Sequence, residues 1–346
     1  LSTAHCPLSP VPRPRPARMP AMKRVLSGIQ PSGQLHLGNY AGAIRQFIDM
    51  QQDHELFIFV ASYHALTSTR DPQQLRENIR QVVVDYIAFG LDPQRDNVHL
   101  YLQQDVPQVT ELCWILSCVC PKHMMDKATS YKDKVAKGLP ASVGLYTYPI
   151  LQAADILSVN PDFVPVGEDQ RQHVEITRDL AQAFNHHYGE VFKLPEMRSR
   201  QGAAVLPGVD GQKMSKSYGN DIDPFMPEKP LRKRIMKIVT DSKGVDEPKD
   251  PETCTVFQIF RGLAGADDPR TAELAEKYRA GGMGYGDAKQ ALYELILDHF
   301  ADARERRQAL IDDPGYVDDV LKRGAEAAGA EVAKLTARAR QAVGLV

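Results

Sequence analysis

Two lysines stand three residues apart in DGQKMSKSYGN, residues 210–220, among glycines and serines and without apolar periodicity. Lys213 and Lys216 are spaced to flank one polyanion, such as a triphosphate, because each ammonium group is a compact point charge. Ser215 and Ser217 can donate hydrogen bonds to phosphate oxygens or hold the loop. The alternative interpretation of such a pair is a solvated surface loop, so other segments must decide.

A glycine-bearing turn follows the first apolar run of the chain, in SGIQPSGQLHLGN at residues 27–39. A turn of this kind between a strand and a helix directs backbone N–H groups and a helix N-terminus at an anion. His36 and Asn39, three residues apart at the helix start, can both reach a phosphate or a ribose. The alternative is a tight connection whose glycines serve only the turn.

An apolar helix at residues 147–157, TYPILQAADIL, contains one carboxylate. Gln152 and Asp155 share a face of this helix because they are three residues apart. Burying a lone aspartate is costly unless it gains a partner, and a group that can only donate, such as an indole N–H, is suitable. Alternatively, Asp155 caps a neighbouring loop.

The elements that must position these residues alternate between strands and helices. Short apolar runs predict strands at residues 23–28, 55–62, 97–104 and 162–167, and periodic segments predict helices at 71–90, 107–120, 143–159 and 168–187. This alternation predicts an α/β fold with a Rossmann-like parallel sheet and ligands at the carboxyl ends of the strands.

The second part of the chain shows helical patterns and no convincing strand. We expect helices over 229–242, 285–310 as one continuous element, and roughly Tyr316 to Ala342, with two shorter ones between. The predicted organisation is a disordered Pro-rich tail at 1–21, a Rossmann-like catalytic domain at 22–220 and a helical domain at 221–346. The last helix has the length to return and pack on the catalytic domain.

Composition limits the classes of partner. The 346 residues are 43% hydrophobic and 25% charged with a formal net charge of -2, so nucleic acid would need a local basic patch. No apolar run approaches the roughly 20 residues that span a bilayer, so we expect no membrane segment. The basic residues of one segment could form the patch: Lys229, Arg232, Lys233, Arg234 and Lys237.

The five cysteines predict neither a disulfide framework nor a metal site. Cys113, Cys118 and Cys120 lie together on an apolar helix and are expected to be buried thiols. Cys254 is the only cysteine after residue 120, so an iron–sulfur cluster is not expected. A reducing, cytoplasmic location fits this usage.

The pairing of the two candidate phosphate segments resembles a known family. HLGN at 36–39 and KMSKS at 213–217 stand in the order and at the separation of the two signatures of class I aminoacyl-tRNA synthetases. Asn39 replaces the second histidine of the usual signature, and GNY at this place is similar to the bacterial tryptophanyl type. The segment VPVGEDQRQHVEITRDLAQAFN, 164–185, resembles the same type, and the resemblance extends from Met22 to Val346.

This resemblance implies a reaction and its participants. The enzymes of the family join an amino acid to ATP with Mg²⁺, release pyrophosphate, and transfer the aminoacyl group to the terminal adenosine of a tRNA. For the tryptophanyl type the substrates are L-tryptophan, ATP and the tRNA for tryptophan. The resemblance also implies a helical domain that reads the anticodon and a homodimer, with the region of Trp114 at the subunit contact.

The resemblance further implies roles for individual residues. As catalytic residues it indicates Lys213, Lys216, His36, Asn39 and Lys132. For ATP it indicates Ser27, Gln30, Gly38, Gly167, Asp169, Met214, Ser215 and Ser217. For tryptophan it indicates Asp155, Gln152, Tyr148, His64, Val166 and Gln170, and no metal ligand from the protein. The chain departs from many relatives at Ser62, where they have aspartate, so recognition of the ammonium group would depend on other residues, such as Gln170.

Three alternatives stay open at this stage. A tyrosyl-tRNA synthetase shares both signatures and an Asp/Gln pair in its pocket. A small-metabolite nucleotidyltransferase uses an H-x-G-H turn but lacks a lysine loop of this spacing followed by a long helical region. A paralogue that binds tRNA without catalysis is the third, although His36 and both lysines are present.

Overall fold

The computed structural model describes residues 22–31, 33–128, 131, 135–136, 138–167, 170–199 and 205–345. The tail expected over 1–21 therefore lies outside the described residues. The centre of the molecule is a five-stranded parallel sheet in the order β3-β2-β1-β4-β5. Its strands are β1 (Lys23–Ile29), β2 (His54–Val60), β3 (Val98–Leu102), β4 (Phe163–Val166) and β5 (Glu196–Ser199). The order reverses between β1 and β4, and open parallel sheets bind their ligands at such a reversal, beyond the carboxyl ends of the strands.

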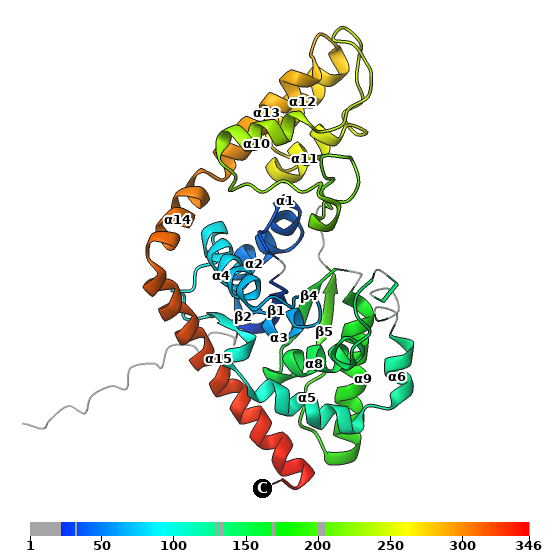
Figure 1. The fold of residues 1–346 in the computed structure, drawn as a ribbon, viewed down its shortest axis with the longest axis vertical. Coiled ribbons are helices and arrows are strands. Elements are labelled where there is room, and N and C mark those ends of the chain that lie inside the picture. Colours follow the sequence, from blue (N-terminus) through cyan, green and yellow to red (C-terminus); the bar gives the residue numbers. More distant parts are fainter. Residues whose placement is uncertain are drawn as a thin grey trace, which may run out of the picture.

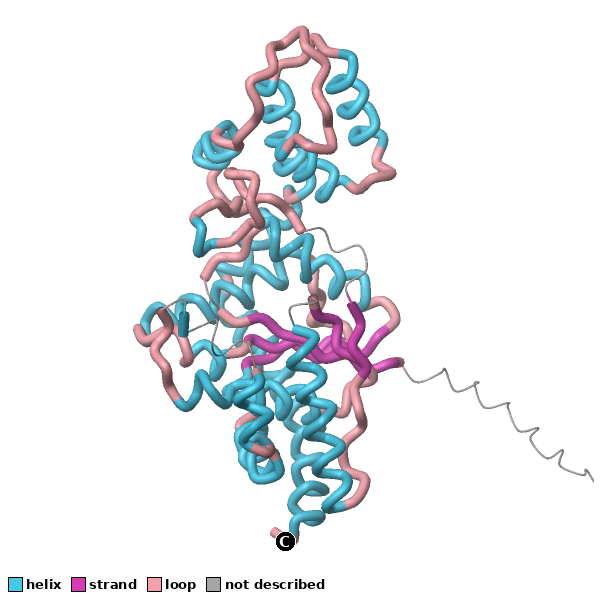
Figure 2. Tube along the Cα trace, turned by 90° about the vertical axis from the view of Figure 1, so that its right-hand side faces the viewer, coloured by secondary structure: helices cyan, strands magenta, loops and turns pink. Residues whose placement is uncertain are grey.

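Both faces of the sheet are covered, as Figure 2 shows by the helices above and below the strands. Val25 of β1 belongs to one apolar core, and Leu26, its neighbour in sequence, belongs to the other. Burial on both faces explains why the strands read as continuous apolar runs. The Rossmann-like sheet and the four predicted strands are confirmed. The sequence pattern does not predict β5, because this four-residue strand contains Glu196 and Arg198 and forms the edge of the sheet.

The catalytic half contains helices of very different length. They are α1 (Leu37–Asn39), the π-helix η1 (Tyr40–Ile44), α2 (Arg45–Met50), α3 (Ser62–Ala65), α4 (Pro72–Phe89), α5 (Gln108–Val119), α6 (Lys122–Lys127), α8 (Val143–Ser158) and α9 (Arg171–Tyr188), with short 3-10 turns at η2 (Gln103–Asp105) and η4 (Lys216–Tyr218). α4 begins and ends where its sequence indicates: the Asp71 carboxylate accepts two backbone N–H groups, and Gly90 takes the left-handed conformation at φ 117°.

One expected strand end is wrong in a way that concerns the site. The apolar run 55–62 is predicted as strand throughout, but β2 ends at Val60, and Ser62 begins the short helix α3. The chain therefore turns at the carboxyl edge of the sheet, and the polar residues after β2 gather there. Apolar periodicity does not show this turn because Ala61 and Ala65 are buried as well.

The helical region contains α10 (Glu228–Met236), α11 (Thr255–Ala264), α12 (Pro269–Ala280), α13 (Tyr285–His299), α14 (Ala301–Asp312) and α15 (Pro314–Val343). α10 to α13 form a separate group at one end of the molecule, whereas α14 and α15 run back along the catalytic half (Figure 1). The single helix expected over 285–310 is interrupted at Phe300. This side chain is buried and packs its ring against Tyr40 and Phe89, which redirects the chain between α13 and α14.

No helix among the described residues is long and apolar enough to cross a membrane. The expectation of three buried thiols on α5 and just after it is wrong: Cys118 is exposed, and Cys113 and Cys120 are half-buried. Trp114 on the same helix is 69% exposed, so α5 presents an apolar outer face.

The docking of α15 on the sheet gives the first prediction. A Cβ on Gly324 would overlap the carbonyl oxygen of Leu100 in β3, whereas a Cβ on Gly329 of the same helix would meet nothing within 4 Å. Gly324→Ala should therefore lower the free energy of unfolding by about 1–3 kcal/mol through overpacking. Gly329→Ala, the matched control, should raise it by up to about 1 kcal/mol, since alanine favours the helix. Urea unfolding of both variants measures this, and equal effects would contradict the close packing.

Candidate functional site

The turn after β1 is built around a buried histidine. His36 is 7% exposed and precedes α1, and its backbone N–H donates to the Oδ1 atom of Asn39 at 3.1 Å. On the other side, the Leu37 N–H donates to the carbonyl oxygen of Ile222 at 2.9 Å. His36 Nδ1 has no hydrogen-bond partner among the described residues. This histidine is therefore held by its backbone, and its Nδ1 atom is a buried polar group with no partner among the described residues.

Burial keeps the His36 ring neutral. Removal from water lowers the pKa of His36 to about 4, the charge of Asp221 opposes this change, and the charge of Lys216 adds to it. At neutral pH the ring is therefore an uncharged donor and acceptor rather than a cation.

The lysine loop touches this turn. The Gly38 N–H donates to the Sδ atom of Met214 at 3.3 Å, although the two residues are 176 positions apart. Met214 is 4% exposed, so its side chain anchors the loop in the apolar core. A Cβ on Gly38 would lie 3.0 Å from the His36 ring and 3.4 Å from Met214 Cβ, so the contact requires glycine. The fold thus brings the two candidate phosphate segments together.

Asn220 holds the lysine loop in shape. Its Oδ1 atom accepts from the Ser215 N–H at 2.7 Å, and its Nδ2 atom donates to the Lys213 carbonyl at 3.1 Å and to Asp210 Oδ1 at 2.7 Å. The Ser215 and Ser217 hydroxyls lie 2.9 Å apart and bond to each other. The sequence offers no signal for the role of Asn220, because an asparagine after a glycine reads as an ordinary turn residue.

The two lysines have different environments. Lys213 is exposed, whereas Lys216 is half-buried, and its Nζ atom lies 3.5 Å from the position of a Cβ on Gly33. Burial lowers the pKa of Lys216, and the charges of Asp221, Asp85 and Asp223 oppose this change. Lys216 is therefore placed beside the turn, and Lys213 faces solvent.

Asp155 is buried at 3% exposure, and both of its oxygens accept hydrogen bonds. Its Oδ2 atom lies 2.8 Å from His64 Nε2, and the Gln103 side-chain amide donates to both carboxylate oxygens at 2.8 Å. Gln103 Oε1 accepts the Tyr63 N–H at 2.9 Å, which orients the amide group toward Asp155. Asp155 therefore does not cap a loop; it is the acceptor at the centre of a polar cluster.

Gln103 and Ser62 are the members of this cluster that sequence reasoning misses or leaves unexplained. Gln103 follows β3 directly and is 1% exposed. A polar residue at the carboxyl end of an apolar strand is the sequence feature that could have indicated its place in the site. The Ser62 hydroxyl accepts from the Gln104 N–H at 3.3 Å and so ties α3 to η2. Ser62 here has a supporting role between two loops.

Other predicted residues surround this cluster. The Tyr148 hydroxyl lies 2.7 Å from His173 Nε2, and the Tyr148 ring meets the His64 ring edge to face at 6.2 Å. Gln152 Nε2 lies 3.5 Å from Gln170 Oε1, a long hydrogen bond between α8 and the start of α9. These side chains come from three segments that end at the same edge of the sheet.

The predicted ATP residues outside the loop are distributed unevenly. The Gln30 amide donates to the His64 carbonyl at 3.3 Å and to Ser68 Oγ at 3.0 Å, so it links the ends of β1 and α3. Val166 and Gly167 lie at the carboxyl end of β4, beside the strand reversal, while Ser27 is buried inside β1. Lys132 and Asp169 lie outside the described residues.

The basic cluster of α10 is not a uniform cationic face. Arg234 Nε donates to the Asp221 carbonyl at 2.8 Å, and Arg234 Nη2 donates to the Gly219 carbonyl at 2.5 Å. This arginine therefore supports the end of the lysine loop through its Nε and Nη2 atoms. Lys229, Lys233 and Lys237 are exposed.

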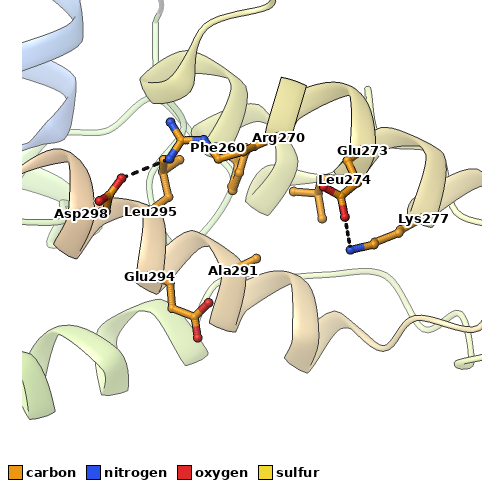
Figure 3. Close-up of a pocket in the computed structure, with 9 residues that line it drawn as sticks. All are labelled: Phe260, Arg270, Glu273, Leu274, Lys277, Ala291, Glu294, Leu295 and Asp298. Carbon is orange, nitrogen blue, oxygen red and sulfur yellow. Dashed lines mark hydrogen bonds and ion pairs between the residues drawn. The ribbon is translucent and has the colours of Figure 1, made fainter. Parts of the chain in front are cut away.

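The helical region contains a shallow pocket of about 270 Å³ between α11, α12 and α13 (Figure 3). Four of its five charged side chains form two ion pairs, Arg270 with Asp298 at 3.1 Å and Lys277 with Glu273 at 2.7 Å, and the fifth, Glu294, accepts a hydrogen bond from Gln290. It is separate from the turn and the lysine loop. No group of three or more His, Cys, Asp or Glu side chains in the described part of the chain could hold a metal ion.

Comparison with known proteins gives consistent results. A family model described as tRNA synthetases class I (W and Y) matches residues 21–301. The tryptophan–tRNA ligase of Rhodopirellula baltica is 49% identical over 322 residues, which cover 93% of this chain and 99% of that protein. The corresponding ligase of Fusobacterium nucleatum is 47% identical over 328 residues and covers 94% and 99%.

Solved structures agree. The crystal structure of Campylobacter jejuni tryptophanyl-tRNA synthetase complexed with ADP and tryptophan matches with a TM-score of 0.87 at 45% identity, covering 93% of this chain and 99% of that one. A tyrosyl-tRNA synthetase from Aeropyrum pernix matches with a TM-score of 0.64 at 20% identity, which indicates a shared fold alone.

The buried His36 gives a prediction on pH dependence. Between pH 6.5 and 4 the unfolded chain protonates this histidine and the native state does not, so the free energy of unfolding falls as pH falls through this window. From pH 7 to pH 5, the free energy of unfolding of His36→Gln should therefore fall by about 2 kcal/mol less than that of the wild-type protein. Urea unfolding at both pH values checks this. The exposed His123 provides the control, and a His36→Gln variant with the slope of His123→Gln would contradict the burial effect.

Proposed function

This chain belongs to the class I tRNA synthetases of the tryptophan and tyrosine type, and from this premise we propose that it is a tryptophan–tRNA ligase. It activates L-tryptophan with ATP to tryptophanyl-adenylate, releases pyrophosphate, and transfers the tryptophanyl group to the terminal adenosine of its tRNA. The observation that carries the proposal is the contact of the glycine turn with the lysine loop, Gly38 N–H to Met214 Sδ, beside the strand reversal of the sheet.

Tryptophan is favoured over tyrosine by the relatives, since those of 45–49% identity that cover most of this chain are tryptophan–tRNA ligases. The Asp155 cluster is compatible with this choice. An ionised carboxylate can only accept hydrogen bonds, and an indole N–H can only donate. Because His64 and Gln103 hold the carboxylate at fixed angles, Asp155 can present an oriented lone pair to the substrate.

The first step places negative charge on the leaving pyrophosphate. Groups that are positive, or that donate hydrogen bonds, stabilise its transition state most when they are fixed before the reaction begins. In the proposal, Lys216 and His36 meet the phosphates from the side of the turn, and Lys213 approaches from solvent as ATP binds. Asn39 holds the turn through its Oδ1 atom, which accepts from the His36 N–H, and its Nδ2 group is the donor that would meet a phosphate.

Mg²⁺ would neutralise part of the triphosphate charge when it enters with ATP, and no residue of this chain is assigned to it. Met214 and Ser215 position the loop, and Gln30 and Gly167 lie on either side of the strand reversal. The amino-acid side would be completed by Tyr148, Gln152, Val166 and Gln170, which lie around Asp155 or beside the strand reversal.

The helical region is the proposed binding region for the tRNA. The exposed Lys229, Lys233 and Lys237 of α10 can contact phosphates, with an affinity that falls as salt rises. We further propose a homodimer formed through the face of α5 that exposes Trp114, and a cytoplasmic location. A particle mass of 38.5 kDa in solution would count against the dimer.

ATP–pyrophosphate exchange with each of the twenty amino acids tests the proposed function. Exchange should occur with tryptophan, and Asp155→Asn should raise the KM for tryptophan by about tenfold or more, because the amide cannot accept through both of its polar atoms. The KM for ATP serves as the internal control and should stay near the wild-type value. Exchange with tyrosine instead would overturn the specificity, and no exchange with any amino acid would overturn the reaction.

A further inference from the structure

A buried ion pair joins the helical region to the catalytic half behind the site. Asp85 of α4 is 1% exposed, and its Oδ1 atom accepts from Arg307 Nε of α14 at 2.9 Å and from Gln81 Nε2 at 2.9 Å. Burial raises the pKa of Asp85, and the hydrogen bond and charge of Arg307 oppose this rise. The carboxylate therefore depends on Arg307 for its compensation.

The second oxygen of this carboxylate faces the signature turn. Asp85 Oδ2 accepts from the Leu35 N–H at 3.4 Å, directly before His36. The Leu37 N–H, directly after His36, donates to Ile222. His36 is therefore bracketed by two backbone contacts, one to α4 and one to the segment that follows the lysine loop.

α14, the helix of Arg307, also contacts the segment that follows the lysine loop. Arg304 Nη1 donates to the Pro224 carbonyl, and the Arg307 guanidinium lies 4.9 Å from the centre of the Phe225 ring. α14 thus contacts Asp85, whose carboxylate binds the turn at Leu35. It also contacts Pro224 and Phe225, which lie in the segment after the lysine loop. Because α14 follows α13 directly, a displacement of the helical region would reach both sides of the site.

The charges in this junction act on Lys216, the half-buried lysine of the loop. Asp85, Asp221 and Asp223 all counteract the effect of burial on the pKa of Lys216. The junction therefore lies close enough to Lys216 for its carboxylates to act on the ammonium group.

We propose that Arg307 and Asp85 are positioning residues for ATP. Their ion pair fixes the position of the turn relative to the lysine loop and couples this position to the helical region. The proposal rests on the proposed function only for the identity of the reaction, because the affinity for ATP can be measured without assaying that reaction. Neither residue is placed in contact with substrate. A pair that served only stability would leave the affinity for ATP unchanged.

Equilibrium binding of ATP by calorimetry, together with ATP–pyrophosphate exchange, tests this coupling. Arg307→Met keeps the aliphatic stem and removes the charge. It should weaken ATP binding about tenfold, within the usual range of coupling between sites. The KM for tryptophan should stay near wild type. The matched control is Arg80→Met on α4, the helix that also contains Asp85. This change breaks the contacts of Arg80 with Asp318 and the Pro314 carbonyl, and Arg80 contacts neither signature segment.

A double variant separates positioning from stability. Replacing a buried pair by apolar side chains of similar size is often neutral for folding, so Asp85→Leu/Arg307→Met should have a Tm near wild type. The proposal predicts that this variant still binds ATP weakly, whereas recovery of wild-type ATP affinity would overturn it. Should this variant not fold, Asp85→Asn takes its place, with weakened ATP binding expected and wild-type affinity contradicting the proposal. Failure of the proposed function would show instead as absent exchange in the wild-type protein.

Discussion

The contact between the glycine turn and the lysine loop is the constraint on which the site depends. The two segments are 176 residues apart at Gly38 and Met214, and they meet only because the strand order reverses between β1 and β4. Met214 is buried, so the loop is anchored by an apolar side chain while its lysines remain at the surface or beside the turn. Asn220 then fixes the loop by three hydrogen bonds, two to its backbone and one to the Asp210 carboxylate. The two lysines proposed to act in catalysis are thereby positioned by the burial of Met214 and the hydrogen bonds of the loop.

The Asp155 cluster, the proposed binding place of the amino acid, follows a different principle, since its central group is a buried anion. Burial of Asp155 is tolerated because His64 and Gln103 contact both of its oxygens, and Gln103 is itself oriented by the Tyr63 N–H. The cost of burying a carboxylate is offset by donors whose directions are fixed. A carboxylate held in this way selects a substrate by the direction of its donor group as well as by its size.

The sequence predicts the parts of the structure that repeat along the chain, and less well the parts that depend on contacts between distant segments. Apolar runs and caps locate four strands and the ends of α4, because burial on both faces and capping leave local patterns. The edge strand β5 and the break at Phe300 are missed, since a short polar strand and a buried aromatic inside a helical pattern carry no such signal. The sequence also does not show that Arg234 turns back to the Gly219 carbonyl, because this contact joins two segments that only the fold brings together.

The central claim is that Lys216, seated beside the turn, stabilises the transition state of ATP cleavage. The most direct measurement is the single-turnover rate of tryptophanyl-adenylate formation for Lys216→Ala, with Lys229→Ala of α10 as an exposed control. The account predicts a rate at least about 100-fold below wild type for Lys216→Ala, because a fixed charge at the leaving phosphates is lost. The dissociation constant for tryptophan should stay near wild type. An adenylate rate close to that of the wild-type protein would contradict the account.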